Sequence, residues 1–551
     1  MAVPLGWYMA KVLDGGAPLL NKIMAPIESS IAKCCGVSLE EEMDWKKYLI
    51  TMLWVNLFGM LSVYLIQRLQ YFLPLNPEHL PSVTPELAFN TAASFVSNTN
   101  WQAYAGETTM SYFTQMLALT VQQFLSAATG IAIMMAFIRG LVRQQVVGLG
   151  NFWQDAIRSI MFILLPLCVI FSLLLVSQGV IQNLKPYVDA VLLEPHSVST
   201  QHIPMGPVAS MVAIKLLGVN GGGFFGVNAA HPFENPSLIT NYMQLLALIL
   251  LPAALCYTFG ILVKNKSQGW TMLITMTLIF IPLAFISMQA EQQGNPLLHN
   301  LNIINNSNME GKEVRFGAAS SALWGAATTA TSNGAVNSMH DSAMPISGFI
   351  YLILMQMGEI IFGGLGCGLY SMLLIVIISV FIGGLMVGRT PEYLGKHIDS
   401  YEIKMISVAV LVLTSIVLIA SAFSCVTLEG TAPLKNQAAH GLSEILYAFT
   451  SMRNNNGSAF AGLNANTNFY NILGGIIMLI GRYWLMLALL AVAGSLASKK
   501  VVPVSLGTLA TNDTMFVLLL ISVIFIIGAS SFFPALALGP IVEHLILWNM
   551  S

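Results

Sequence analysis

Long runs of uncharged, apolar residues recur along the chain and are separated by shorter polar segments. A run of about 20 such residues is long enough to cross the hydrocarbon core of a bilayer as a helix. The sequence therefore predicts membrane spans near 48–66, 117–138, 157–177, 243–263, 271–289, 347–387, 405–424, 471–495 and 515–537.

The sixth run (347–387) is too long for one ordinary crossing. As a continuous helix it would extend about 60 Å, which is twice the thickness of a bilayer core. Gly363, Gly364, Gly366 and Gly368 fall inside it. The run therefore forms either two spans or one span that is interrupted near 363–368.

The basic residues favour one of these alternatives, because cytoplasmic loops carry an excess of Lys and Arg. With one interrupted crossing, 15 of the 23 basic residues lie on a single side. They are Lys11, Lys22, Lys33, Lys46, Lys47, Arg139, Arg143, Arg158, Lys264, Lys266, Arg389, Lys396, Lys404, Lys499 and Lys500. Two crossings would move the last five to the other side, so we predict one interrupted crossing.

Residues 1–47 contain no predicted span and are assigned to the cytoplasmic side. Leu19, Ile23, Ile27 and Ile31 recur every four residues. This spacing is typical of an amphipathic helix, which lies either on the inner membrane surface or against inner loops of the protein itself.

The connections on the opposite side resemble one another. Each has an apolar stretch of about ten residues and then a cluster of small polar residues: ELAFNTAASFVSNTNWQ (86–102), VASMVAIKLLGVNGGGFFG (208–226), SSALWGAATTATSNGAVN (320–337) and SEILYAFTSMRNNNGSAFAG (443–462). Their three-residue cores are Asn98-Thr99-Asn100, Val219-Asn220-Gly221, Ser332-Asn333-Gly334 and Asn455-Asn456-Gly457. One such cluster alone would indicate a surface turn, but four on one side predict a repeated unit of span, re-entrant helix, loop and span.

This repeat predicts the division of the chain. The repeats are 48–142 with loop 97–102, 143–266 with loop 218–223, 267–404 with loop 331–335, and 405–500 with loop 454–458, and an extra span follows at 515–537.

Four such loops around one axis suit a cation site. Non-helical backbone at membrane depth is tolerated where it lines a watery cavity or is buried in protein. A ring of backbone carbonyl oxygens can replace the hydration shell of a weakly hydrated monovalent cation, and glycine allows the backbone conformations that aim those oxygens inward. The cores contain no carboxylate, which favours neutral carbonyl coordination.

Composition excludes a soluble multidomain enzyme, because only 9% of the residues are charged and 56% are hydrophobic. A soluble domain carries about 25% charged residues. The net charge of −2 without a basic tail argues against nucleic acid as a partner. The chain has no P-loop, DKTG or HExxH motif, so uphill transport would need energy from another chain or an ion gradient.

Several long runs carry a family resemblance: FNTAASFVSNTNWQAYAGETTMSYFTQM, KLLGVNGGGFFGVNAAHPFENP, NMEGKEVRFG, GLMVGRTPEYLGKHID, NNNGSAFAGL and FFPALALGP. They closely resemble the KdpA family, the potassium-binding subunits of potassium-transporting P-type ATPase complexes. The resemblance extends from about residue 40 to the C-terminus. A wider similarity connects this family with potassium channels and Trk/Ktr-type transporters.

The resemblance implies a non-catalytic subunit in the bacterial inner membrane, with four loops around a pseudo-fourfold pore. The twelve core residues would form the potassium filter, with Gln102 at the pore mouth. Potassium would pass through an intramembrane tunnel to the subunit KdpB, which hydrolyses ATP. KdpC and a small KdpF peptide would complete the complex. Potassium would be the only metal, and no organic cofactor is expected.

The sequence departs from the family pattern at two places. Val219 stands where the family often has Thr, so the carbonyl is kept and a hydroxyl is lost. The family also has a span before its PLG-like segment, whereas this sequence starts at MAVPLG. We therefore expect an N-terminus on the inner side.

Two charged residues are predicted inside spans, where an ionisable group indicates a functional site. The resemblance implies that the segment after Glu359, with Gly363, Gly364 and Gly366, forms a loop below the filter that stops direct inward passage. Alternatively, Glu359 caps or pairs within the broken helix. Arg482 would oppose cation exit toward the cytoplasm, or else form a structural ion pair or bind loop carbonyls.

Two further motifs each have a simpler structural interpretation beside the functional one. The inner segment GRTPEY (388–393) resembles a family motif that docks the ATPase subunit, and it equally suits a positive-inside anchor. His340 and Asp341 follow the third loop with no second ligand nearby in the sequence, so we interpret them as cap or turn residues.

Three functions fit a polytopic chain of this kind. They are a channel-like subunit of an ATP-driven pump, a self-contained potassium channel or symporter, and a secondary transporter with broken helices. The third expects inverted repeats, whereas this chain shows four repeats with all loops on one side. The resemblance favours the pump subunit.

Overall fold

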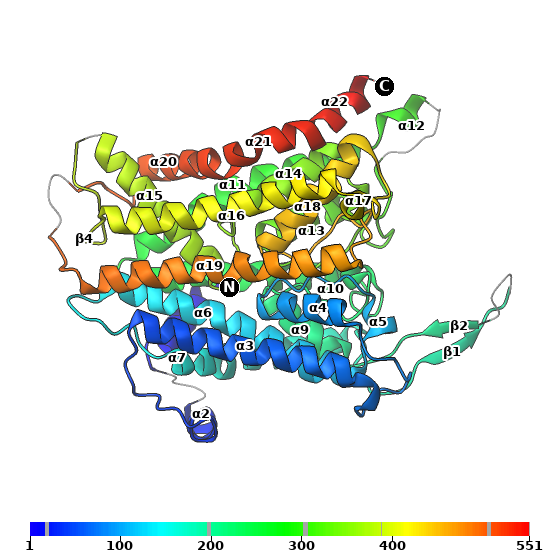
Figure 1. Ribbon diagram of the computed structural model, residues 1–551, viewed down its shortest axis with the longest axis horizontal. Helices are drawn as coiled ribbons and strands as arrows, with labels where there is room; N and C mark the ends of the chain where they lie inside the picture. Colours follow the sequence, from blue (N-terminus) through cyan, green and yellow to red (C-terminus); the bar gives the residue numbers. More distant parts are fainter. Residues whose placement is uncertain (17–20, 195–199, 301–306, 387, 504–507, 550–551) are drawn as a thin grey trace.

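The computed structural model describes residues 1–16, 21–194, 200–300, 307–386, 388–503 and 508–549. Long helices lie side by side along the longest axis of the molecule (Figure 1). Within the described chain, nine helical segments are long and apolar enough to cross a membrane: Trp45–Phe72, Thr114–Val142, Phe152–Ser177, Leu238–Leu262, Lys266–Leu298, Cys367–Met386, Ser400–Val426, Asn468–Ser498 and Ser530–Asn549. The predicted all-α polytopic membrane fold is confirmed.

The first two repeats each place a short re-entrant helix between two spans. Repeat 1 consists of α3 (Trp45–Leu69), α4 (Pro85–Val96) and the π-helix η2 (Thr114–Thr120) that continues into α6 (Val121–Val142). Repeat 2 consists of α7 (Phe152–Arg158), η3 (Ser159–Leu164) and α8 (Leu165–Ser177), then α9 (Val208–Leu217) and α10 (Leu238–Leu262). Their connections contain η1 (Gln70–Phe72), α5 (Gly106–Thr109), η4 (Asn228–Ala230) and the antiparallel hairpin of β1 (Val188–Val191) and β2 (Thr200–Ile203).

The last two repeats have the same order of elements. Repeat 3 consists of α11 (Lys266–Gln293), α12 (Pro296–Asn300), α13 (Gly317–Ala330), η5 (His340–Ser342), α14 (Pro345–Gln356) and α15 (Cys367–Met386). Repeat 4 consists of α16 (Ser400–Val426), α17 (Leu428–Thr431), α18 (Ala438–Arg453) and α19 (Asn468–Ser498). A hairpin of two short strands, β3 (Glu392–Tyr393) and β4 (Lys396–His397), joins them on the side that the sequence predicts to be the inner one.

The sixth apolar run forms a single broken crossing. The helix ends at Gln356 and resumes at Cys367, and between them Gly358, Phe362 and Gly366 have positive φ angles of 90°, 52° and 81°. A right-handed helix cannot continue through left-handed residues. Helix α14 packs on α11, α13 and α18, whereas α15 packs on α6, α20 and β3, so the two halves occupy opposite ends of the molecule.

The C-terminal helical run extends past the predicted limit at residue 537. It comprises α20 (Thr514–Ile524), η6 (Phe525–Ala529), α21 (Ser530–Leu536), η7 (Ala537–Ile541) and α22 (Val542–Asn549). Pro534 and Pro540 each lack a backbone N–H, which usually ends or kinks a helix. Pro540 lies within η7, where Gly539 has non-helical angles (φ −96°, ψ −106°), so the run is kinked there between two helices.

Helix α1 (Ala2–Leu13), which the apolar pattern did not predict, packs against α10. Gly6 makes the close approach possible, because a Cβ atom there would lie 2.6 Å from the Ala254 carbonyl oxygen. Pro166 cannot donate a helical hydrogen bond to the Phe162 carbonyl. The Tyr8 hydroxyl donates to that oxygen instead, at 2.7 Å.

Helix α2 (Asn21–Cys35) is attached to α7 through an ion pair between Glu28 Oε1 and Arg158 Nε at 3.0 Å. Ala32 and Glu28 are buried, whereas Ile27 is 40% exposed. The helix therefore turns Met24, Glu28 and Ala32 toward the protein and leaves Ile27 of the predicted apolar stripe exposed. Leu19 lies outside the described residues.

The inner hairpin connects the ends of three repeats. Lys396 Nζ donates to the carbonyl oxygens of Arg143 at 2.6 Å and Lys499 at 2.7 Å, and the Tyr393 hydroxyl donates to Gln268 Oε1 at 3.2 Å. Tyr393 and Lys396 are fully buried. Within GRTPEY, only the part before residue 391 is fully exposed among the described residues.

Candidate functional site

Four short, largely buried helices lead into the four polar loops. They are α4, α9, α13 and α18, of 10 to 16 residues each. At about 1.5 Å per residue they are too short to cross a bilayer. The C-terminus of each helix, which carries a partial negative charge, is followed directly by a loop core.

The loop cores share one backbone conformation. The first and third residues of every core have positive φ: Asn98 (69°) and Asn100 (53°), Val219 (52°) and Gly221 (83°), Ser332 (51°) and Gly334 (88°), Asn455 (48°) and Gly457 (100°). Non-glycine residues seldom adopt this conformation. Residues of alternating handedness turn successive peptide groups the same way, so each core can present its carbonyl oxygens on one side.

The cores contact one another in a closed ring. A Cβ atom added to Gly221 would lie 1.8 Å from the Asn333 carbonyl oxygen, one on Gly334 would lie 1.9 Å from that of Asn456, and one on Gly457 would lie 2.2 Å from that of Thr99. The third residue of loops two, three and four therefore lies against the middle residue of the next loop. Glycine is required there by space as well as by φ.

Side-chain amides join the same neighbours. Asn98 Nδ2 donates to the Val219 carbonyl at 2.9 Å, and Asn455 Nδ2 donates to Thr99 Oγ1 at 2.8 Å. Asn333 Nδ2 donates to the Lys215 carbonyl at 3.1 Å, and Asn456 Nδ2 donates to the Thr328 carbonyl at 2.8 Å. Every pair of adjacent repeats is thus held by an asparagine, which keeps the loops in register.

An ion pair that sequence reasoning missed braces the second loop. Lys215 Nζ, on α9, donates to Glu234 Oε2 at 2.6 Å and to Asn228 Oδ1 at 2.7 Å, and both charged side chains are fully buried. Asn228 Nδ2 donates to the Gly221 carbonyl at 2.7 Å, and Glu234 accepts from the backbone N–H groups of Phe224 and Phe225. A lysine within an apolar ten-residue stretch was the available signal.

Two glutamines reach the chain that follows the second core. Gln102, the predicted mouth residue, exchanges two hydrogen bonds with the Gly223 backbone, each 2.9 Å long. Gln123 Nε2, from α6, donates to the Gly222 carbonyl at 3.0 Å. Gln102 therefore fastens loop one to loop two, and Gln123 is a contact that the sequence did not indicate.

The residues of the four cores carry no charge of their own. All twelve core residues are buried or nearly so, and none is ionisable. Beyond the second core, His231 stacks on Phe225 with ring centroids 3.8 Å apart, and burial lowers the pKa of His231. This imidazole is consequently neutral at neutral pH and adds no positive charge beside the loops.

Glu359 and Arg482 lie near one another below the ring, and the side chains of both contact Cys367. Arg482 donates to Cys367 Sγ and, at 3.2 Å, to the Ser126 carbonyl. Within the described chain no carboxylate lies within ion-pair distance of Arg482, and Glu359 Oε2 has no hydrogen-bond partner. The Ser126 hydroxyl in turn donates to Asn98 Oδ1 at 2.8 Å, so Arg482 connects the broken helix with the first core.

The loop between α14 and α15 packs directly on the α6 backbone. A Cβ atom on Gly366 would lie 2.2 Å from the Gly130 carbonyl oxygen, and one on Gly130 would lie 2.2 Å from that of Leu365. The two glycines allow this backbone-to-backbone contact. Gly363 and Gly364 are equally confined, by the backbone and the carboxylate of Glu359 respectively.

A cavity of about 60 Å³ begins beside the fourth core and reaches the loop below it. Its lining includes Asn454, Arg453 and Glu359, and at its other side Thr414 of α16 and Gly528 of η6. This volume holds a few water molecules or a partly hydrated ion. The lining residues come from α15, α16, α18, α19 and η6, as well as from the end of α14 and the loop between α14 and α15.

Comparison with known proteins agrees with this architecture. The family model described as potassium-transporting ATPase A subunit, KdpA, matches residues 1–545. Proteins named potassium-transporting ATPase potassium-binding subunit are 54% identical in Herpetosiphon aurantiacus and 52% identical in Sorangium cellulosum, each alignment covering 99% of this chain and 96% of the relative.

A solved structure shares the fold at low sequence identity. The potassium transporter TrkH from Vibrio parahaemolyticus has a TM-score of 0.53 and 12% identity, covering 88% of this chain and 94% of that one. The likeness supports four span–loop–span repeats around a pore. On the strength of the match along almost its whole length, this chain belongs to the KdpA family of potassium-transporting ATPase A subunits.

Proposed function

We propose that this chain is the potassium-binding and translocating subunit of an ATP-driven potassium uptake complex in the bacterial inner membrane. It binds external potassium in the ring of four loops and does not hydrolyse ATP itself. An ATPase subunit of the KdpB type supplies the energy, with KdpC-like and KdpF-like subunits completing the complex.

The observation that carries this proposal is the fourfold repetition of positive φ in the loop cores. That backbone lets carbonyl oxygens line one axis, and the cores themselves bear no charge. Potassium is weakly hydrated and is bound by neutral carbonyl oxygens in filters of this kind. The twelve core residues are the proposed ligands, with Gln102 fixing the mouth.

The proposed route leaves the filter sideways. The loop between α14 and α15 covers the direct inward path, and the cavity beside Asn454 leads toward α16 and η6. Glu359 would attract a cation into this cavity, while the positive charge of Arg482 would oppose movement inward. An ATPase subunit against the α16 side would receive the ion.

Gly221→Asp tests the filter assignment. A carboxylate in the second core replaces neutral coordination, and the new Cβ atom collides with the Asn333 carbonyl. We expect the complex to assemble but to lose discrimination between potassium and sodium, measured as the cation dependence of ATP hydrolysis. Gly36→Asp, at a glycine after α2 that also has positive φ but no atom near its Cβ position, is the matched control. Unchanged selectivity in Gly221→Asp would remove this loop from the filter.

Expression without partners separates the pump from a self-contained channel or symporter. In cells that lack potassium uptake systems, the chain alone should not restore growth at low potassium, and an ATPase subunit should co-purify with it when it is co-expressed. Robust uptake by the chain alone would contradict the pump assignment.

A further inference from the structure

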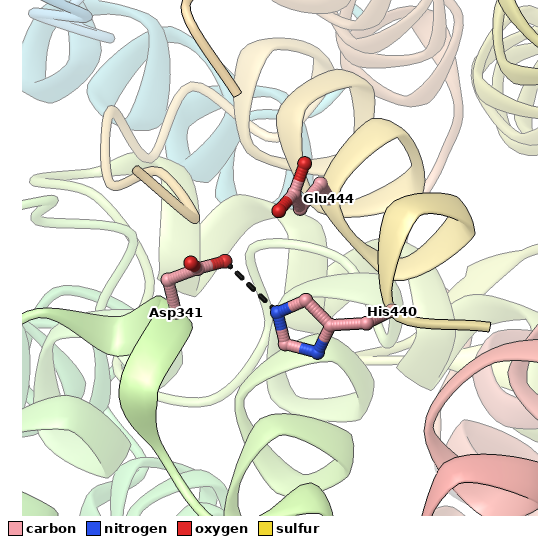
Figure 2. A group of neighbouring side chains, drawn as sticks. All are labelled: Asp341, His440 and Glu444. Atoms are coloured by element: carbon pink, nitrogen blue, oxygen red, sulfur yellow. Dashed lines mark hydrogen bonds and ion pairs between the residues drawn. The ribbon is translucent and has the colours of Figure 1, made fainter. Parts of the chain in front are cut away.

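Three carboxylates surround one imidazole at the end of the molecule where the re-entrant helices begin. Asp341 lies in η5, after the third core, and His440 and Glu444 lie one turn apart near the start of α18. Glu543 belongs to α22. Figure 2 shows Asp341, His440 and Glu444 directed toward a common space, and their nearest ligand atoms all lie within 4.8 Å of one another.

The contacts hold His440 as a metal-binding imidazole is held. His440 Nδ1 lies 2.7 Å from Glu543 Oε1, which fixes the ring, and Nε2 faces Asp341 Oδ1 at 3.1 Å. A carboxylate on the far nitrogen is the usual partner of a metal-bound histidine. Asn436 Nδ2 donates to Glu444 Oε1 at 2.6 Å and orients that carboxylate.

The charges of the group are not balanced by neighbouring side chains. Among the described residues, no lysine or arginine forms an ion pair with Asp341, Glu444 or Glu543. One imidazolium would neutralise only one of three carboxylates. Glu444 is buried and the Asp341 side chain is only 9% exposed, and like charges this close are costly unless a cation or protons join them.

A second observation points to a missing ligand. Glu444 is fully buried, and its Oε2 atom has no hydrogen-bond partner. Gly462 lies close against the same carboxylates, because a Cβ atom there would lie 2.1 Å from Glu444 Oε1 and 2.7 Å from Asp341 Oδ2. An unpaired buried carboxylate oxygen is a strong acceptor for a cation.

We propose that Asp341, His440 and Glu444 bind a divalent transition-metal ion, with Zn²⁺ as the best match. One nitrogen and two carboxylate oxygens are ligands that Zn²⁺ accepts, and water completes the shell. Atoms bound to one ion at about 2.1 Å lie at most about 4.2 Å apart, so small side-chain rotations suffice. The cavity of about 430 Å³ lined by Asp341, His440 and Glu543 provides the entrance.

The ion would act as a clamp far from the filter. It would join η5, which follows the third core, to the re-entrant helix that ends at the fourth core, and through Glu543 it would engage the C-terminal helix. The interpretation of Asp341 as a turn residue then becomes incomplete, because its partner lies 99 positions away in the sequence.

Zinc stoichiometry tests the site directly. The full-length chain, purified with the subunits that accompany it, is stripped with a chelator, dialysed against micromolar Zn²⁺ and analysed for bound metal. We expect one saturable equivalent in the wild type that is lost in Glu444→Gln and His440→Gln. His202→Gln is the matched control, since His202 pairs with Asp189 on an exposed hairpin, and it should retain the equivalent.

Gly462→Ala and a spectroscopic probe test whether loss of zinc reflects the loss of the site or misfolding of the variant. Gly462→Ala keeps all the ligands but fills the space between them, so it should also lose zinc. It should nevertheless elute in size-exclusion chromatography as the wild type does. Co²⁺ in place of Zn²⁺ should give visible d–d bands in the wild type and in His202→Gln only. Retained zinc in Glu444→Gln, equal loss in His202→Gln, or no saturable zinc in the wild type would overturn the proposal. None of these outcomes depends on potassium binding.

Discussion

Gly221, Gly334 and Gly457 show how a single missing side chain shapes the site. Each has positive φ, and each lies against a backbone carbonyl of the neighbouring loop. Loop one has Asn100 at the equivalent position. The geometry of the ring therefore depends on three glycines, whose replacement would cost conformational strain and bring a Cβ atom into collision with a neighbouring backbone carbonyl.

Gly334→Ala isolates that collision. Alanine in a left-handed conformation costs about 1–2 kcal/mol, and here its Cβ would also lie 1.9 Å from the Asn456 carbonyl oxygen. We expect half-maximal ATP hydrolysis to need on the order of tenfold more potassium, which corresponds to about 1.4 kcal/mol. Gly36→Ala has the same strain without the contact and should leave the potassium dependence unchanged. Equal effects in the two variants would contradict the steric account.

At the scale of elements, the broken helix between α14 and α15 depends on contacts from two other repeats. Gly130 of α6 receives the loop backbone, and Arg482 of α19 connects Cys367 to the Ser126 carbonyl. The same arginine could therefore serve as a charge barrier or as a brace. A lysine at this position distinguishes the two roles. It would keep the positive charge of a barrier, but it lacks the forked guanidinium geometry that a brace needs.

Arg482→Gln and Arg482→Lys separate the two roles. If the charge is the barrier, proteoliposomes that contain Arg482→Gln should conduct potassium passively without ATP. Proteoliposomes that contain Arg482→Lys should show no passive potassium flux. Passive flux in both variants would assign a bracing role to Arg482. Flux in neither would remove Arg482 from control of the ion path.

At the scale of the whole molecule, the proposed route from the cavity reaches one face of the protein, between α16 and η6. Thr414 lines it from α16, and Gly528 lines it from η6. Both elements have exposed apolar neighbours, such as Leu411 and Ile526, at 65% exposure each. The proposed route thus ends at a surface that lipid or another chain must cover.

Thr414→Trp should block that route. The indole would fill the cavity of about 60 Å³, and we expect potassium-stimulated ATP hydrolysis to fall at least about tenfold, because each tenfold step corresponds to only about 1.4 kcal/mol of barrier. Ile50→Trp, on the exposed side of α3, is the control and should remain active. Full activity in Thr414→Trp would place the ion path elsewhere.

The sequence predicted the features whose cause is local. Apolar runs mark the spans because a bilayer demands them, and Asn/Gly clusters mark the loops because few residues tolerate positive φ. Contacts between segments that are distant in the sequence produce no comparable local pattern of residues. Glu234 and Lys215 are 19 residues apart, Asp341 and His440 are 99 apart, and Tyr8 reaches Phe162 across 154. Such pairs exist only once the helices have packed.

Because one chain supplies all four loops, the ring is not bound by exact symmetry. Val219 and Asn100 already depart from the pattern of the other cores. In a tetramer of identical subunits one substitution changes four positions at once, whereas here it changes a single quadrant. Ion affinity can consequently be adjusted in small steps during evolution, and a variant damaged in one quadrant can be rescued by a change in another.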